Sequence, residues 1–217
     1  MPTVIAIDGP AGSGKSSVSK QVARELGFGY LDTGAAYRAL AWWAVAEGLE
    51  GDTLAARLST FDYSISTNPD DFWVRVGSID VTEAIRESAI SEAVSSVARI
   101  PAVRSFMKQL SRSIIAGEKR DGIVVEGRDI TTVVAPDAQV RLLLTADEAV
   151  RIKRRSAELS VASQQITKQV TDRDASDLKV VDFITPAVGV ELIDSTELDL
   201  PKTVQAVLSA VSRQLAI

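Results

Sequence analysis

The sequence predicts an α/β fold in which a five-stranded parallel sheet is flanked by helices and interrupted by a small antiparallel insertion. Two observations support this prediction. Apolar, strand-like segments alternate with helical patterns along most of the 217 residues, an order typical of a parallel sheet covered by helices. Between the second and third of these strands, three short strand-like segments replace the alternation, which indicates an inserted subdomain.

The first strand is expected at 3–8 and the first helix at 15–26, where apolar residues recur at helical spacing. Between them lies a complete G-x-x-x-x-G-K-[ST] phosphate-binding loop. Its glycines let backbone N–H groups surround phosphate oxygens, and the helix start adds its dipole. We expect a nucleoside triphosphate here, with Lys15 on its β- and γ-phosphates and the Ser16 hydroxyl as a Mg²⁺ ligand. The triphosphate-binding residues expected from the loop are Gly9, Pro10, Ala11, Gly12, Ser13, Gly14, Lys15, Ser16 and Ser17.

The second strand and helix are expected at 28–32 and about 35–47. Gly48 and Gly51 are expected to end this helix, because glycine commonly follows a helix C-terminus. The pattern then changes to short segments of antiparallel character. Strands of this insertion are expected at 62–66, 72–77 and 78–81.

The rest of the chain returns to alternating order and completes the sheet. Further helices are expected at about 88–98, 102–116 and 147–159 and at the C-terminal end, and further strands at 123–126, 140–144 and 190–194. These elements divide the chain into three predicted parts, which are a core of 1–58, 101–155 and 179–217, an inserted subdomain of 59–100, and a lid of 156–178.

The composition excludes several kinds of chemistry. The chain has no cysteine, so no disulfide, zinc-thiolate site or thiol nucleophile is expected. Histidine, the commonest general base, is also absent. The net charge of −5 argues weakly against a nucleic-acid partner, and the longest apolar stretch, 39–46, is too short to cross a membrane. With no basic leader in the sequence, a cytoplasmic location is expected.

A phosphate-binding loop indicates a nucleoside triphosphate but leaves the reaction open. Three classes compete, namely a kinase for a small acceptor, a GTPase switch and an ATPase module. The chain lacks an N-K-x-D guanine-binding motif, and its third core strand ends in Val-Glu-Gly-Arg-Asp at 125–129 rather than in consecutive acids. A kinase whose acceptor is a phosphate explains more, because a phosphate with a second pKa of about 6 needs no general base near neutral pH. The chain's paired arginines fit a phosphate acceptor, because the planar fork of arginine suits phosphate oxygens.

The segment that follows the second strand reads D-T-G-A-A-Y-R at 32–38. Thr33 is expected to cap the next helix, and Arg38 to point from its first turns toward the mouth of the sheet. Alone, this segment is equally compatible with a capped helix that carries a solvated arginine.

Taken together, several segments resemble bacterial cytidylate kinases. They are the phosphate-binding loop, D-T-G at 32–34 with Y-R at 37–38, E-G-R-D-I-T-T-V-V-A-P-D-A at 126–138, and I-D-S-T at 193–196. The match runs in order over nearly the whole chain and includes the insertion. The resemblance implies a P-loop fold in which the insertion binds a nucleoside monophosphate. It also implies transfer of the γ-phosphoryl group of ATP to CMP or dCMP, with Mg²⁺.

The same resemblance implies an acceptor site residue by residue. A hydroxyl and two arginines would hold the acceptor phosphate, and a carboxylate would accept a hydrogen bond from the cytosine amino group. Surface alternatives stay open for Ser95 and Arg104, since serine and arginine are common on solvated helix faces. The implied substrate-binding residues are Thr33, Arg38 and Arg128 at the phosphate, Ser95, Arg104 and Asp129 at the cytosine, and Asp174 at the sugar.

The expected lid departs from the family pattern. Val170 and Asp177 stand where related enzymes carry arginines, so Arg173 and Asp174 alone remain of an R-x-x-R-D-x-x-R arrangement. The segment 177–183 also differs from the more frequent R-A-x-A-P-L. The expected catalytic residues are Lys15, Arg128 and Arg173.

A basic cluster precedes the lid, and the spacing of Arg151, Arg154 and Arg155 brings them close together on a helix. The resemblance places Arg154 and Arg155 beside ATP, although a run of charges is also typical of a solvated face. Two alternative functions stay open, which are a kinase for another nucleoside monophosphate such as UMP and a non-catalytic, nucleotide-dependent switch. No feature demands an oligomer, so a monomer is expected.

Overall fold

The main sheet has the predicted five parallel strands. The computed structural model describes residues 2–159 and 182–216, and within them the strands lie in the order β2-β6-β1-β7-β8. Their bounds are Thr3–Asp8 for β1, Gly29–Asp32 for β2, Gly122–Gly127 for β6, Val140–Thr145 for β7 and Glu191–Asp194 for β8. The register pairs Asp8 with Gly127 and Asp32 with Glu126. The polar ends of three neighbouring strands therefore lie at one edge of the sheet.

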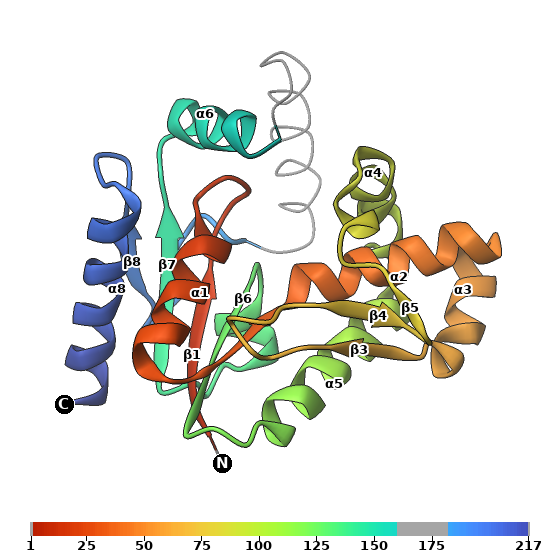
Figure 1. The fold of residues 1–217 in the computed structure, drawn as a ribbon, viewed down its shortest axis with the longest axis horizontal. Coiled ribbons are helices and arrows are strands. Elements are labelled where there is room, and N and C mark those ends of the chain that lie inside the picture. The colour runs from red at the N-terminus through yellow and green to blue at the C-terminus, as the bar shows by residue number, and fades with distance from the viewer. Residues whose placement is uncertain (1, 160–181, 217) are drawn as a thin grey trace.

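Both faces of the sheet are buried, as the continuous apolar strands predict. Side chains alternate along β1, so that Ile5 and Ile7 face one hydrophobic cluster while Ala6 faces another. The first cluster includes α1 (Lys15–Leu26) and α8 (Leu200–Leu215), which pack against each other. The second includes part of α5 (Pro101–Gly117) and a π-helical turn at Ile130–Val134. Figure 1 shows the sheet between these layers.

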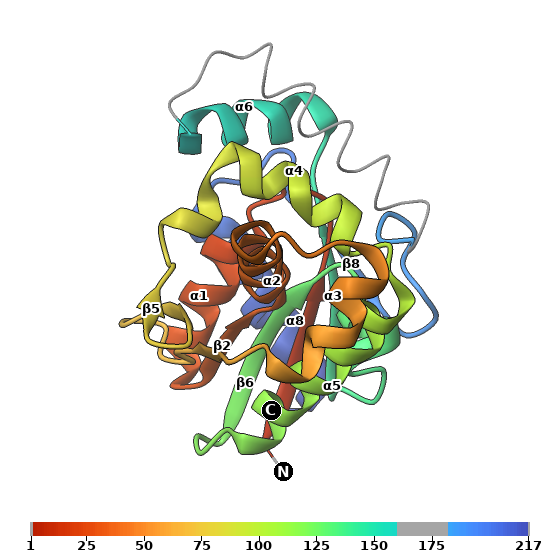
Figure 2. The ribbon, with the colours of Figure 1, turned by 90° about the vertical axis from the view of Figure 1, so that its right-hand side faces the viewer.

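The insertion forms a separate three-stranded antiparallel sheet, as predicted. Its strands β3 (Tyr63–Ile65), β4 (Val74–Val76) and β5 (Ile79–Asp80) are shorter than the expected ranges. Of these strands, β3 and β4 share one hydrophobic cluster with α2 (Thr33–Glu47), α4 (Ser88–Val97) and α5. In this cluster the Phe61 ring centroid lies 5.3 Å from that of Trp43 and 5.6 Å from that of Tyr63. Figure 2 shows α2 end-on, with α4 above it. The domain boundaries proposed at 59 and 100 stay a prediction.

Two expected helix ends are wrong, and both errors have local causes. Gly48 ends α2 with a φ of 63°, but Gly51 begins another helix, α3 (Gly51–Arg57), instead of closing the previous one. That helix starts where the Thr53 hydroxyl oxygen accepts a hydrogen bond from the Glu50 N–H at 3.0 Å. At the other end of α2, Asp32 is the capping residue, because its Oδ1 accepts from the Ala35 N–H at 2.8 Å.

One more helix, α6 (Glu148–Leu159), follows β7 and lies above the sheet in Figure 1. It begins close to the expected position and carries the basic cluster. Within the described part of the chain, every helix is too short or too polar to cross a membrane.

Candidate active site

The phosphate-binding loop connects β1 to α1 and depends on its glycines. Gly12 has a φ of +74°, and a Cβ there would stand 2.5 Å from the carbonyl oxygen of Arg151. A side chain at Gly9 would meet the Leu144 carbonyl oxygen at 2.1 Å. Lys15 folds back over the loop, and its Nζ donates to the Pro10 carbonyl at 2.8 Å. The predicted loop therefore adopts a tight turn with its lysine across the mouth.

Two arginines of α6 support this loop from the outside. Arg151 Nη1 donates to the Ala11 carbonyl at 2.9 Å. Arg154 donates through Nη2 to the carbonyls of Ser195 at 2.8 Å and Leu198 at 2.9 Å, and through Nη1 to the Ser195 hydroxyl at 2.9 Å. These contacts link α6, the loop and the turn after β8. The expected contact of Arg154 and Arg155 with ATP stays a prediction, and the contacts that the structure gives Arg154 are to the protein backbone and to Ser195.

A buried carboxylate stands directly before the loop. Asp8 is 3% exposed and accepts from the backbone N–H groups of Ile130 and Thr131, both at 2.8 Å, and from the Thr131 hydroxyl at 2.7 Å. Burial raises the pKa of Asp8, while these three donors and the charge of Lys15 lower it. Asp8 thus ties the end of β1 to the turn that follows Arg128 and Asp129.

Two further carboxylates lie side by side where β2 and β6 end. Glu126 accepts from the Tyr30 hydroxyl at 2.6 Å, and burial together with the charge of Asp32 raises the pKa of Glu126. Burial would also raise the pKa of Asp32, but the Arg38 guanidinium and the Ala35 N–H hold it below its ordinary value. Arg38 Nη2 lies 2.8 Å from Asp32 Oδ2. Arg38 is therefore anchored at the mouth of the sheet, as predicted.

Thr33 has a different local role from the expected cap. Its hydroxyl donates to the carbonyl oxygen of Glu126 at 2.7 Å, which fixes the start of α2 against the end of β6. A Cβ at Gly127 would stand 2.5 Å from this hydroxyl, so the glycine of the G-R-D run lets Thr33 approach.

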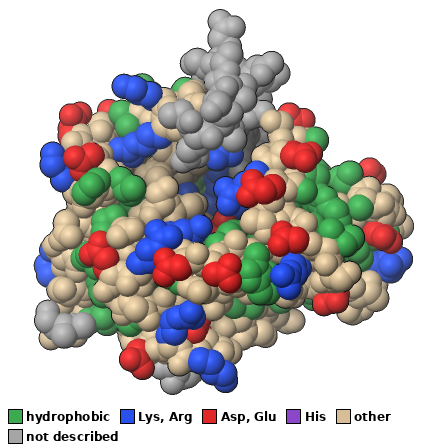
Figure 3. All heavy atoms as spheres, in the orientation of Figure 1, with side chains coloured by type: hydrophobic (Ala, Val, Ile, Leu, Met, Phe, Trp, Pro, Cys, Tyr) green, Lys and Arg blue, Asp and Glu red, His purple; other side chains and the backbone are tan. Residues whose placement is uncertain are grey.

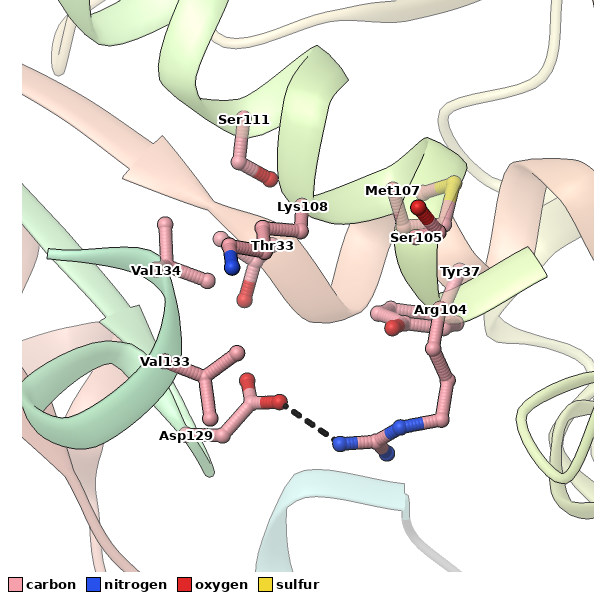
Figure 4. A pocket seen from close by; sticks show the side chains of 10 residues that line it. All are labelled: Thr33, Tyr37, Arg104, Ser105, Met107, Lys108, Ser111, Asp129, Val133 and Val134. Carbon is pink, nitrogen blue, oxygen red and sulfur yellow. Dashed lines mark hydrogen bonds and ion pairs between the residues drawn. The ribbon is translucent and has the colours of Figure 1, made fainter. Parts of the chain in front are cut away.

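A pocket of about 210 Å³ opens between α2, α5 and the turn after β6. Thr33, Arg104 and Asp129, three of the predicted acceptor residues, line it. Figure 4 shows Arg104 and Asp129 facing each other, and their Nη2 and Oδ2 atoms are 3.1 Å apart. Burial raises the pKa of Asp129, and the Arg104 charge opposes this rise.

On the outer surface, Figure 3 shows a hollow in the face drawn, with lysine and arginine side chains around it.

Sequence reasoning missed several pocket residues. Lys108 and Ser111 line the pocket with Arg104, and their spacing of four and three places all three on one face of α5. This spacing is a signal that the sequence contained. Ser95 lies half-buried in α4 and is not among the residues that line this pocket.

Other predicted site residues do not line this pocket. Arg128 lies beside the ring of Phe183, whose centroid is 4.4 Å from the guanidinium carbon. Ser16 lies in the first turn of α1, and its side chain forms a hydrogen bond with Glu126. Arg173 and Asp174 lie outside the described residues, as do Val170 and Asp177.

A family model described as cytidylate kinase matches residues 5–213 of the chain. A cytidylate kinase of Cutibacterium acnes is 45% identical over 97% of this chain and 96% of its own length. Cytidylate kinases of Streptomyces coelicolor and Pelotomaculum thermopropionicum are 41% and 40% identical, over 98% and 96% of this chain and 94% and 95% of their own lengths.

Solved structures support the fold. A crystal structure from Thermus thermophilus superposes with a TM-score of 0.53 at 17% identity, and it covers 99% of this chain and 98% of the other. An uncharacterised protein from Eubacterium ventriosum gives the same TM-score at 15% identity, with 98% and 99% covered.

Proposed function

Because the chain belongs to the cytidylate kinase family, we propose that it transfers the γ-phosphoryl group of ATP to CMP or dCMP. The products are ADP and CDP or dCDP. The observation that best supports this proposal is the pocket in which Thr33, Arg104 and Asp129 converge. It adjoins the strand ends where ligands bind in open parallel sheets.

In this proposal the phosphate-binding loop holds the donor. Backbone N–H groups of the loop cradle the ATP phosphates, and Lys15 moves from the Pro10 carbonyl to the β- and γ-phosphates. The Ser16 hydroxyl and the carboxylate of Glu126 beside it are oxygen donors of the kind that Mg²⁺ prefers. The metal would neutralise charge on the phosphates. The described residues contain no cluster of three metal-ligating side chains, and Mg²⁺ commonly needs only one or two in such sites.

The acceptor phosphate is assigned to Thr33, Arg38 and Arg128. Asp32 contacts Arg38 through Nη2, which orients a planar fork whose other N–H groups can bind phosphate oxygens. The phosphate is already largely ionised near neutral pH, so the absence of histidine from the chain is no obstacle. Catalysis then consists of in-line positioning and charge neutralisation.

Recognition of the cytosine ring is assigned to Asp129, which Arg104 orients. An ionised carboxylate accepts from the cytosine 4-amino group but repels the carbonyl oxygen that uracil carries there. For Ser95, Asp174 and Arg173, we propose the roles that the family resemblance implies. We further propose that Mg²⁺ accompanies ATP and that the enzyme acts in the cytoplasm as a monomer.

An ADP-release assay with CMP, dCMP, UMP and AMP tests the proposal. We expect ADP formation to rise strongly with CMP and dCMP and weakly with UMP, with cytidine as the phosphate-free control. Preferred turnover of UMP would identify a different monophosphate kinase. ADP release that no acceptor stimulates would favour the nucleotide-dependent switch.

A further inference from the structure

Phe183 is a buried aromatic residue to which the proposed mechanism gives no role. It is 1% exposed, although its neighbours Asp182 and Ile184 are exposed to solvent. Its ring centroid lies 4.4 Å from the guanidinium carbon of Arg128, the arginine assigned to the acceptor phosphate. Phe183 also ends the segment 177–183, which departs from the family pattern.

The backbone around Phe183 is fixed by a local turn. The Oδ1 atom of Asp182 accepts hydrogen bonds from the N–H groups of Ile184 and Thr185, both at 2.9 Å. These bonds connect the residue before Phe183 to the two residues after it. The ring therefore enters the protein from a turn of defined geometry.

The contact suits the chemistry of a phosphate-binding arginine. The N–H groups of a guanidinium lie in its plane and point outward from its edges. The guanidinium carbon of Arg128 lies over the ring of Phe183, so the electron-rich ring face attracts the cation and helps to hold it in place. Asp32, by contrast, orients Arg38 by accepting a hydrogen bond from one of its N–H groups. The Asp32 contact thus occupies one donor of Arg38, whereas the ring contact of Arg128 occupies none.

We propose that Phe183 is a positioning residue for acceptor binding, because its ring holds the guanidinium of Arg128 in place. This inference rests on the proposed function, which assigns Arg128 to the CMP phosphate. Phe183 itself touches no reacting atom in this proposal. Its loss lowers the affinity for phosphorylated acceptors and leaves the ATP loop unaffected.

The test weakens the ring face and keeps the side chain's shape. Replacing Phe183 with trifluorophenylalanine withdraws electron density from the ring, so attraction to the cation falls while the packing is nearly preserved. We expect the KM for CMP to rise about fivefold, and the KM for ATP to stay unchanged, because a buried cation–π contact has this order of effect. The same replacement at Phe61, which packs against Trp43 and Tyr63, is the matched control and should leave both constants unchanged.

A double-mutant cycle shows whether the effect passes through Arg128. In an Arg128→Ala background, fluorination of Phe183 should no longer change the KM for CMP. A Phe183→Leu variant, which removes the ring altogether, should raise this KM at least as much as fluorination does.

Four outcomes would overturn the proposal, in different ways. An unchanged KM for CMP in the fluorinated protein, or equal effects with and without Arg128, would overturn the inference and leave the proposed function standing. A parallel rise of the KM values for CMP and ATP would show a general structural role instead. A wild-type protein without CMP-dependent ADP release would overturn the proposed function and this inference together.

Discussion

Replacing Asp129 with asparagine tests how the pocket distinguishes cytosine from uracil. The change keeps the shape of the side chain and removes its charge. In the structure, Oδ2 of Asp129 lies 3.1 Å from Arg104 Nη2, and the Asp129 side chain is 16% exposed. One carboxylate oxygen is thus held by the arginine in a largely dry site, and the other is the expected acceptor for the cytosine amino group.

The expected magnitude follows from this geometry. A hydrogen bond to a charged group contributes about 1.5–3 kcal/mol, which corresponds to a factor of about 10 to 150 in kcat/KM. The amide also removes the repulsion of the uracil carbonyl. The ratio of kcat/KM for CMP to that for UMP should therefore fall by at least about tenfold.

The assay measures kcat/KM for both monophosphates at saturating ATP. Asp137→Asn is the matched control, because Asp137 is an exposed acid of the same sequence run. If Asp129→Asn leaves the CMP-to-UMP ratio of kcat/KM unchanged, the reasoning is refuted. Recognition of cytosine would then be assigned to Ser95, Arg104 or the shape of the pocket.

The pH dependence gives an independent check on Asp129. Burial raises the pKa of its carboxyl group above the ordinary value, and the group accepts from cytosine only when it is ionised. The preference for CMP should be full above this raised pKa and decline as the pH falls through it. The asparagine variant should lack this component, so the difference between the two profiles isolates Asp129.

Three other predictions concern the loop, its buried support and the lid. Lys15→Ala should lower kcat about a hundredfold or more while CMP binding, measured by titration, stays comparatively intact; near-normal turnover would remove the lysine from the mechanism. Thr131→Val removes a charged hydrogen bond to Asp8 and should lower the melting temperature by about 3–12 °C at neutral pH. Because the ionised form of Asp8 needs this bond most, the loss should shrink as the pH falls through the pKa of Asp8, and an equal loss at all pH values would contradict it. Lys179, the next cation along the chain, is the expected partial substitute for the arginines missing at Val170 and Asp177. Arg173→Ala should depress kcat more than Lys179→Ala does, since arginine offers two donors from a fixed fork; the reverse order in steady-state assays would contradict the assignment.

Local sequence patterns predicted the parts of the molecule that depend on local chemistry. The phosphate-binding loop and Lys15 are found where the motif placed them, because the glycines and the preceding strand determine that turn almost alone. The cap of α2 was assigned to Thr33 rather than Asp32, since both residue types cap helices and only the positions of Ala35 and Glu126 decide between them.

Other features depend on residues far apart in the chain. The bond between Asp8 and Thr131 spans 123 positions, and the contact between Arg128 and Phe183 joins two distant segments. No local spacing predicts such contacts, because they arise only when the strands have paired. Lys108 is an intermediate case, since helical periodicity from Arg104 already pointed to it.

The tryptophans of the chain, Trp42, Trp43 and Trp73, all lie on the side of α2 and the small sheet. Trp43 packs against Phe61, and the Arg75 guanidinium carbon lies 4.5 Å from the Trp73 ring centroid. The phosphate-binding loop, α1, α6 and α8 contain no tryptophan. The intrinsic tryptophan fluorescence of the protein therefore comes from one side of the molecule alone. Trp42 and Trp43 lie in the same helix as Thr33 and Arg38, so a titration of tryptophan fluorescence can follow monophosphate binding without any label.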